Sequence, residues 1–207
     1  MSKNHAVGFD YQNQNPGGAE SYILPALVEL LLKKNISGRI LDIGCGNGSV
    51  ARKLEKHGFE VWGCEWDPQG VAIASQEKPD RFLCWDLNAP VTEFPWRGFS
   101  AIISSEVIEH LFLPRNLFRL AHHTLVPQGF LALTTPYHGY WKNLAISLVG
   151  KWDWHHNVQH DGGHIKFFSP KALQEMMKEE KFTPQGWKGC GRVPGLWKSM
   201  MMWGLKN

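Results

Sequence analysis

The sequence predicts an α/β fold in a single domain: a doubly wound sheet of seven strands, mostly parallel, with an antiparallel C-terminal hairpin. Three observations predict it. Between residues 38 and 135 short apolar runs alternate with segments of helical periodicity, which is typical of a parallel sheet covered by helices. The first apolar run ends in a glycine-rich turn, and several later runs end in an acidic residue. The 207 residues are enough to bury one core.

The N-terminal part of the chain divides into a polar arm and an amphipathic helix. Residues 1–18 are rich in Asn, Gln and Gly, so we expect a mobile arm. The segment Ala19–Lys34 is predicted to be a helix because leucines and isoleucine recur at helical spacing. Pro25 falls within its first turns, where proline is tolerated. We therefore divide the domain into residues 1–36, a core at 37–136, an insertion at 137–168 and a C-terminal part at 169–207.

A strand, a tight turn and a helix start are predicted over Ile40–Ser49, and a helix over Val50–His57 follows. Glycine at alternate positions of the turn lets a ligand approach the backbone closely, and a helix start offers unpaired N–H groups. The dinucleotide fingerprint G-x-G-x-x-G is matched by Gly44 and Gly46, but Ser49 stands where its third glycine belongs. The turn therefore predicts a site for a polar or anionic ligand group.

Four further strands are predicted to end at the same edge of the sheet as this turn. They are Phe59–Glu65, Arg81–Leu87, Phe99–Glu106 and Gly129–Pro136, with helices expected at Pro68–Gln76, Val107–Leu113 and Pro114–Thr124 between them. Ligands of such sheets bind at the carboxyl ends of the strands. Glu65 follows the glycine turn by roughly 20 residues, where a carboxylate can accept hydrogen bonds from ribose hydroxyls. The glycine turn, the acids and Ser105 therefore predict one cofactor site.

The run D-I-G-C-G-N-G beginning at Asp42 resembles motif I of the class I S-adenosylmethionine-dependent methyltransferases. The resemblance implies a Rossmann-like fold and S-adenosylmethionine as the cofactor, with the glycines beneath its methionine part. It further implies that Asp86 meets the adenine amino group and that Leu87 packs on the ring. In that family the leader often folds over the cofactor, so Tyr11 and Tyr22 are expected either to close the site or to pack on the surface. The predicted cofactor residues are Asp42, Gly44, Cys45, Gly46, Glu65, Trp66, Asp86, Leu87 and Ser105.

A second group of residues, with the spacing E-x-x-E-H, follows the fourth predicted strand. On a helix Glu106, Glu109 and His110 would share one face, and two carboxylates with an imidazole can hold a divalent metal. The segment resembles the O-methyltransferases of ubiquinone biosynthesis and the small-RNA 2′-O-methyltransferases. That resemblance adds His164 as a fourth ligand. We expect Mg²⁺ or another divalent ion at these four residues, or no metal at all.

Without a metal, His110 is the predicted general base and His138 a second candidate. A neutral imidazole takes up a proton near neutral pH and can remove it from a hydroxyl. The predicted reaction is therefore O-methylation of a small hydroxylated molecule, whether aromatic, lipid or sugar-linked. Three alternatives stay open: an S-adenosylmethionine-binding protein without catalysis, an RNA 2′-O-methyltransferase and a nicotinamide oxidoreductase. Ser49 and Asp86 argue against the oxidoreductase.

The C-terminal third departs from the strand–helix alternation. Residues 137–168 are rich in Trp and His around an apolar helix predicted at Leu144–Val149, and such a long insertion is more often a functional lid than a linker. Ser169 is the predicted N-cap of a helix that Pro170 opens. The last strands are expected at Thr183–Cys190 and Leu196–Leu205, as a buried hairpin in preference to a membrane-touching tail.

Composition limits the partners and the compartment. The net charge of +3 is small and scattered, which makes a nucleic-acid partner unlikely and favours a small-molecule substrate. The four cysteines form no C-x-x-C pair, and neither a signal peptide nor a run of roughly 18 apolar residues is present. We therefore expect no transmembrane segment and a cytoplasmic location. Nothing in the sequence indicates the oligomeric state.

Overall fold

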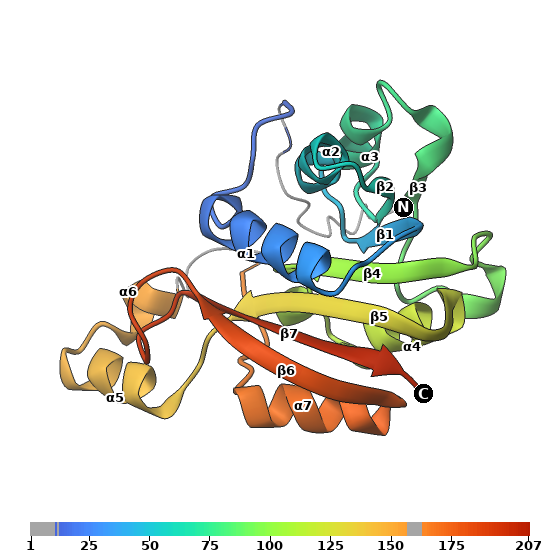
Figure 1. The fold of residues 1–207 in the computed structure, drawn as a ribbon. Helices are drawn as coiled ribbons and strands as arrows, with labels where there is room; N and C mark the ends of the chain where they lie inside the picture. Colours follow the sequence, from blue (N-terminus) through green and yellow to red (C-terminus); the bar gives the residue numbers. More distant parts are fainter. Residues whose placement is uncertain (1–10, 12, 157–162) are drawn as a thin grey trace, which may run out of the picture.

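A computed structural model describes residue 11 and residues 13–156 and 163–207, which fold around one seven-stranded sheet (Figure 1). The strand order is β3-β2-β1-β4-β5-β7-β6. The pairs among β1 to β5 are parallel, whereas β7 runs antiparallel to both β5 and β6. The predicted fold class is confirmed. The strands are Arg39–Ile43 (β1), Glu60–Glu65 (β2), Phe82–Cys84 (β3), Phe99–Ser105 (β4), Leu125–Pro136 (β5), Phe182–Cys190 (β6) and Ser199–Lys206 (β7).

Helices cover both faces of the sheet, because successive apolar side chains of a strand point to opposite faces. Ile40 of β1 belongs to a core shared with α1 and α2, whereas its neighbour Leu41 belongs to a second core shared with α4 and α7. The helices are Glu20–Lys33 (α1), Ser49–Lys56 (α2), Pro68–Ala74 (α3), Arg115–Thr124 (α4), Tyr140–Leu148 (α5), Trp152–His156 (α6) and Pro170–Glu179 (α7). In the part of the chain that the structure describes, no helix combines the length and apolar character needed to cross a bilayer.

The helix expected at Val107–Leu113 does not form, and this prediction is wrong. Glu106 leaves β4 with a left-handed φ of 55°, and only a short 3₁₀ helix (η3) at Ile108–His110 follows. Two sequence features disfavour a helix here, although neither indicates the left-handed turn at Glu106. Val107 and Ile108 are β-branched, and Pro114 disfavours helical backbone at the residue before it. A new helix, α4, begins directly after that proline.

The insertion after β5 folds back onto the site edge of the sheet. It contains α5 and α6, of which α5 begins at Tyr140, four residues before the predicted start. Residues 157–162 of the predicted lid lie outside the described residues. The returning segment is tied to η3, since the N–H groups of Ile165 and Lys166 both donate to the Glu109 carbonyl at 3.0 Å. Helix α7 then starts as predicted, with Ser169 Oγ accepting from the Ala172 N–H at 3.2 Å.

The final two strands form the predicted hairpin, but only β7 is buried, whereas most residues of the edge strand β6 are exposed or half-buried. Met200, Met201 and Met202 of β7 are all buried, because β7 inserts between β5 and β6 instead of lying at the edge. Ser199 at the start of β7 pairs with Pro136 at the end of β5. The loop before β7 is thereby brought to the carboxyl ends of the parallel strands.

Candidate active site

The glycine turn between β1 and α2 is fixed by its neighbours on both sides. The N–H groups of Gly44 and Cys45 donate to the Cys64 carbonyl of β2 at 2.8 and 3.1 Å. Gly44 has a φ of 76°, and a Cβ there would lie 2.4 Å from Val107 Cγ2. Only glycine fits this combination of backbone conformation and close packing. The turn is therefore held directly beneath the segment that follows β4.

Glu65 closes the other side of the turn with its carboxylate. Its Oε2 accepts from the Gly46 N–H at 3.0 Å, and its Oε1 accepts from the N–H groups of Trp66 and Asp67 at 2.9 and 3.1 Å. Burial raises the pKa of Glu65 above its ordinary value, although these backbone donors oppose the shift. The structure thus places Glu65 beside the predicted cofactor turn, bound to its backbone.

Residues 1–10 and 12 of the predicted mobile arm lie outside the described residues, and the described part of the arm lies across the same turn. Asn47 Nδ2 donates to the carbonyls of Asn13 and Asn15 at 2.7 and 2.8 Å. Gln69 Nε2 holds the Tyr11 carbonyl at 2.6 Å, and the Tyr11 ring packs where a Cβ of Gly46 would lie. Burial raises the pKa of the Tyr11 hydroxyl, and the Glu65 carboxylate nearby adds to the shift. The arm is in position to cover a ligand of the turn.

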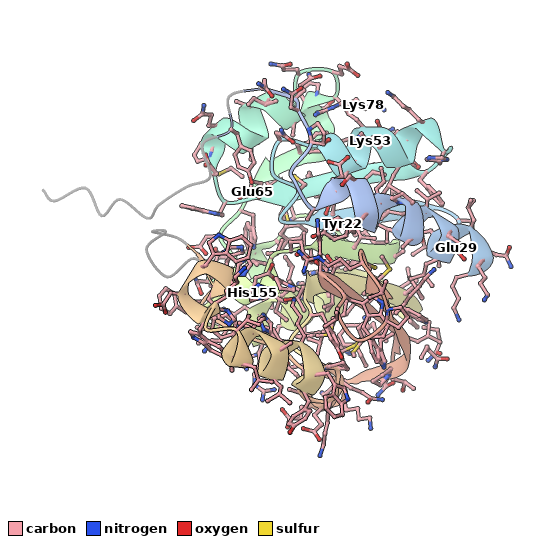
Figure 2. All side chains as sticks on the ribbon, turned by 90° about the vertical axis from the view of Figure 1, so that its left-hand side faces the viewer. Tyr22, Glu29, Lys53, Glu65, Lys78 and His155 are labelled. Atoms are coloured by element: carbon pink, nitrogen blue, oxygen red, sulfur yellow. The ribbon has the colours of Figure 1, made fainter. Side chains whose placement is uncertain are left out.

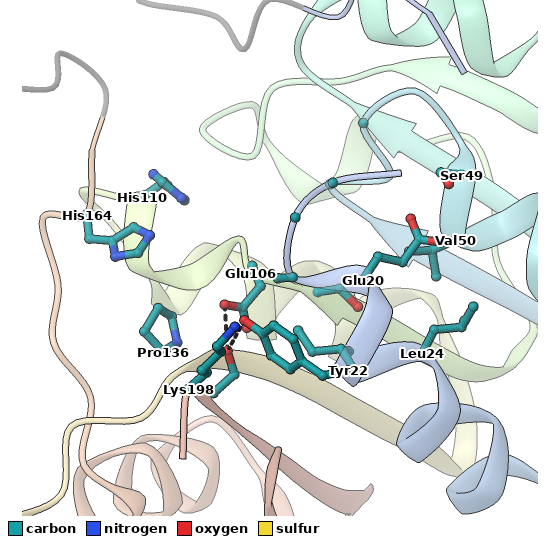
Figure 3. A pocket seen from close by; sticks show the side chains of 18 of the residues that line it. Glu20, Tyr22, Leu24, Ser49, Val50, Glu106, His110, Pro136, His164 and Lys198 are labelled. Atoms are coloured by element: carbon teal, nitrogen blue, oxygen red, sulfur yellow. Dashed lines mark hydrogen bonds between the residues drawn. The ribbon is translucent and has the colours of Figure 1, made fainter. Parts of the chain in front are cut away.

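A cavity of about 580 Å³ extends from the glycine turn to the insertion (Figure 3). Its walls come from the N-terminal helix, the turn, the ends of β4 and β5, the insertion and the loop before β7. This volume is in the range typical of small-molecule sites, about 300–1,000 Å³. The predicted site residues that line it are Asp42, Gly44, Cys45, Gly46, Ser105, Glu106, His110, His138 and His164.

The other predicted site residues are not part of this lining. Asp86 is exposed, and its Oδ1 accepts from the backbone and side-chain N–H groups of Asn88 at 2.8 and 2.9 Å. Leu87 packs against the core shared with α4 and α7, and Trp66 is 43% exposed. Their predicted roles in cofactor binding, including the adenine contacts of Asp86 and Leu87, remain predictions. Glu109 is fully buried directly behind the cavity wall, next to His110.

Glu106 is held apart from the other predicted metal ligands. Thr134 Oγ1 donates to its Oε1 at 2.8 Å. Ser199 Oγ donates to its Oε2 at 2.9 Å, and dashed lines mark the hydrogen bonds around Glu106 in Figure 3. The Tyr22 hydroxyl lies 3.3 Å from the same Ser199 oxygen. Burial raises the pKa of Glu106 to about 7, although both hydroxyl donors oppose the shift. Since the helix expected at Val107–Leu113 is absent, Glu106 does not share a helical face with Glu109 and His110.

The remaining three predicted ligands do come together. Glu109, His110 and His164 offer ligand atoms that all lie within 4.8 Å of one another. Glu109 accepts from Thr135 Oγ1 at 3.0 Å through Oε2, while its buried Oε1 has no hydrogen-bond partner among the described residues. That orphaned oxygen lies 3.9 Å from His164 Nε2. One carboxylate and two imidazoles fit a divalent transition metal better than Mg²⁺, which prefers oxygen ligands.

His138 lies in the cavity wall but differs from His110 in its surroundings. It is only 7% exposed, and its ring stacks on His156 at 5.4 Å between centroids. Burial, with Lys142 nearby, lowers the pKa of His138 to about 4. At neutral pH the imidazole is therefore uncharged and a weak base. This favours His110 over His138 as the proton acceptor.

Comparison with known proteins identifies the family. A profile of the methyltransferase domain matches residues 11–185, which is most of the chain. The chain belongs to this family. The predicted resemblance to class I S-adenosylmethionine-dependent methyltransferases is thereby confirmed.

The relatives and solved structures agree with this assignment. A ubiquinone biosynthesis O-methyltransferase of Cereibacter sphaeroides is 27% identical over 165 residues, covering 77% of this chain and 66%, just under two thirds, of that protein. An S-adenosylmethionine-dependent methyltransferase from Mesorhizobium loti superposes with a TM-score of 0.67 at 19% identity, covering 92% and 99% of the two chains. Magnesium protoporphyrin IX methyltransferase from Synechocystis PCC 6803, with bound SAH, gives 0.66 at 14% identity over 89% and 82%. The two structures support the fold.

Sequence reasoning missed several residues of this methyltransferase site. Lys142, Arg192 and Lys198 line the cavity, as do Glu20 and Ser199. None stands in a motif, and each reaches the cavity only through the tertiary arrangement of α1, the insertion and β7. The position of Lys198 and Ser199 near the start of the predicted final strand was the one available signal. It was not sufficient, because their place at the cavity depends on where that strand inserts in the sheet.

Proposed function

We propose that this methyltransferase transfers the methyl group of S-adenosylmethionine to a hydroxyl oxygen of a small molecule. One observation carries the proposal: a single cavity connects the glycine turn with the cluster of Glu109, His110 and His164. The name of its relatives, ubiquinone biosynthesis O-methyltransferases, supports oxygen as the acceptor atom. At 27% identity the acceptor itself does not carry over.

The residues around the glycine turn fit the cofactor. Bound S-adenosylmethionine would supply an electrophilic methyl group on a positively charged sulfur. Gly44, Gly46 and Ser105 line the same cavity and would hold it there. Asp42 is fully buried, and burial, with Glu65 nearby, raises its pKa to about 8. Most of the rate enhancement expected from such a site comes from holding donor and acceptor in line within a dry cavity.

The chain then has to remove one proton from the acceptor hydroxyl. His110 lines the cavity, and its ring makes a T-shaped contact with the ring of His164, at 4.9 Å between the centroids. We assign it the role of general base. If a divalent metal is present, Glu109, His110 and His164 would hold it, and the ion would supply Lewis-acid activation of the hydroxyl.

The test is transfer of tritium from methyl-labelled S-adenosylmethionine into a fractionated extract of the source organism, with and without EDTA. His110→Gln should lower the rate about 10²-fold or more without changing cofactor affinity. His57→Gln, which alters an exposed histidine at the end of α2, is the matched control and should have no effect. Loss of activity in EDTA would add a metal to the site. Nitrogen- or carbon-methylated product with full activity in His110→Gln would contradict the proposal.

The alternative functions give distinct results in the same experiment. Label recovered in RNA would indicate an RNA methyltransferase. Tight cofactor binding without label in any fraction would indicate a binding protein. Saturable NADH binding in place of S-adenosylmethionine binding would indicate an oxidoreductase.

A further inference from the structure

Three cationic side chains reach the cavity from segments that are distant in the sequence. Lys142 lies on α5, Arg192 in the loop after β6, and Lys198 directly before β7. Strand β7 lies beside β5, and this brings the three segments together. The Tyr137 N–H, just after β5, donates to the Lys198 carbonyl, just before β7, at 3.0 Å. Figure 2 looks onto this side of the molecule, with Tyr22 of α1 between Glu65 above and His155 of α6 below.

Lys142 is the most unusual of the three because it is buried. It is 5% exposed, and its Nζ donates to the carbonyls of Tyr137 and Lys198 at 2.8 and 3.4 Å. An ammonium group has three donors, so one remains for a further acceptor. Within the described ranges no carboxylate lies in ion-pair distance of it. A buried cation without a paired anion is costly, which points to an anion supplied by a ligand.

The acids near these cations offset only part of their charge. Glu20 forms an ion pair with Lys53 of α2. Glu106 is the acid whose charge acts on Lys142, but it is one carboxylate beside three cations, and its oxygens accept hydrogen bonds from Thr134 and Ser199. Burial, with Arg192 nearby, lowers the pKa of Lys142 to about 8, so the amine is still mostly charged at neutral pH. This end of the cavity therefore carries an excess of positive charge.

A second, smaller pocket of about 250 Å³ opens beside the same cations. Lys142 and Arg192 line both cavities, and so does His155. The rest of the smaller pocket is mainly apolar. Its other lining residues are Ala145, Ile146, Val149, Lys151, Trp154 and Leu196. A charged group and an apolar body are thus accommodated side by side.

We propose that the methyl acceptor is an organic anion, whose anionic group binds between Lys142 and Arg192 and whose apolar part occupies the smaller pocket. The inference rests on the proposed function, since it assigns the substrate class of that same site. Guanidinium and ammonium groups both form charge-assisted hydrogen bonds with carboxylate or phosphate oxygens. The accepting hydroxyl then faces His110, at the cofactor side of the anionic group.

The test separates labelled products by charge. Wild-type protein is incubated with tritiated S-adenosylmethionine and a small-molecule extract, and the products are passed over an anion-exchange column at neutral pH. The label should be retained, and alkaline phosphatase treatment of the product should separate a phosphate from a carboxylate. A titration with the retained fraction then gives a half-saturating amount for each variant.

Variants of Arg192 carry the titration, because this loop residue can be changed without disturbing a core. Arg192→Gln should need about tenfold more of the acceptor fraction for half-saturation, since a hydrogen bond to a charged group is lost. Arg192→Lys should stay close to wild type, and so should Lys171→Gln, a control on the exposed face of α7. Lys142→Met is expected to behave like Arg192→Gln if it folds, and cofactor affinity should be the same in all variants.

The possible failures are distinguishable. Label in the unretained, neutral fraction would overturn the inference and leave the methyltransferase function standing. Equal half-saturation in Arg192→Gln and Lys171→Gln would overturn it as well. No label in any fraction, despite cofactor binding, would contradict the proposed function itself and the inference with it.

Discussion

Replacement of Gly44 by Ala tests how tightly the glycine turn packs against the segment after β4. The left-handed backbone costs an L-residue about 1–2 kcal/mol. The new Cβ would also lie 2.4 Å from Val107 Cγ2 and 3.0 Å from Cγ1, an overlap that something must relieve. Overpacking of this kind costs about 1–3 kcal/mol. We therefore expect Gly44→Ala to lower the free energy of unfolding by about 2–5 kcal/mol.

A double-mutant cycle separates the two contributions. In a Val107→Ala background the nearest remaining atom of that side chain is its Cβ, at 3.3 Å, so most of the packing cost should be removed while the backbone cost persists. The cycle should show a coupling of about 1–3 kcal/mol between the two positions. Gly58→Ala is the matched control, since Gly58 has a φ of 87° and a Cβ added to it would meet no atom within 4 Å. Urea unfolding measures all the variants. An equal cost of Gly44→Ala in both backgrounds would refute the packing argument.

The remaining predictions concern a buried acid, a helix cap and the three clustered candidate metal ligands. Burial raises the pKa of Asp42 in the folded protein to about 8. The stability that the protonated carboxyl contributes is therefore fully present below the pKa of Asp42 in the unfolded chain and is lost as the pH rises through about 8. The stability of wild type relative to Asp42→Asn should fall by about 1.4 kcal/mol per pH unit between these limits, and urea unfolding without such a slope would count against it. Ser169→Ala should lower the free energy of unfolding by about 1 kcal/mol, because the side-chain cap on α7 is lost, whereas Ser169→Asp keeps a cap and should change it little. Equal losses of the two variants in urea unfolding would show that the cap does not stabilise α7. Glu109→Gln should weaken Mn²⁺ or Zn²⁺ binding, measured by calorimetry, by about tenfold or more, and unchanged affinity would exclude Glu109 as a ligand.

The strands β2 and β4 could be predicted to within one residue because each is a short, largely buried run with a clear end. In contrast, β5 begins four residues before the predicted Gly129, and β3 covers only Phe82–Cys84 of the predicted Arg81–Leu87. The predicted strand over Phe59–Glu65 differs from β2 by one residue, and the acid at its end lies at the glycine turn as expected. The failure at Val107–Leu113 has a local cause. The left-handed conformation of Glu106 has no sequence signal, since glutamate seldom adopts it. The residue spacing over Val107–Leu113 suits a helix, and the sequence therefore predicts a helix where the chain does not form one.

The candidate site could be predicted only where a motif marks it. Gly44, Gly46 and His110 stand in recognisable runs and line the cavity. Lys142 and Arg192 stand in none. They meet because β7 inserts between β5 and β6, and that choice is made by long-range packing of the whole sheet.

The central claim is that one cavity carries a methyl group from a cofactor at the glycine turn to a hydroxyl beside His110. Its most direct test is a reaction with S-adenosylmethionine carrying a ¹³C-labelled methyl group, followed by NMR of the purified product. We predict a methyl carbon bonded to oxygen, formed by wild type and strongly reduced with His110→Gln. A methyl carbon bonded to nitrogen or carbon, formed equally well by both proteins, would contradict the claim.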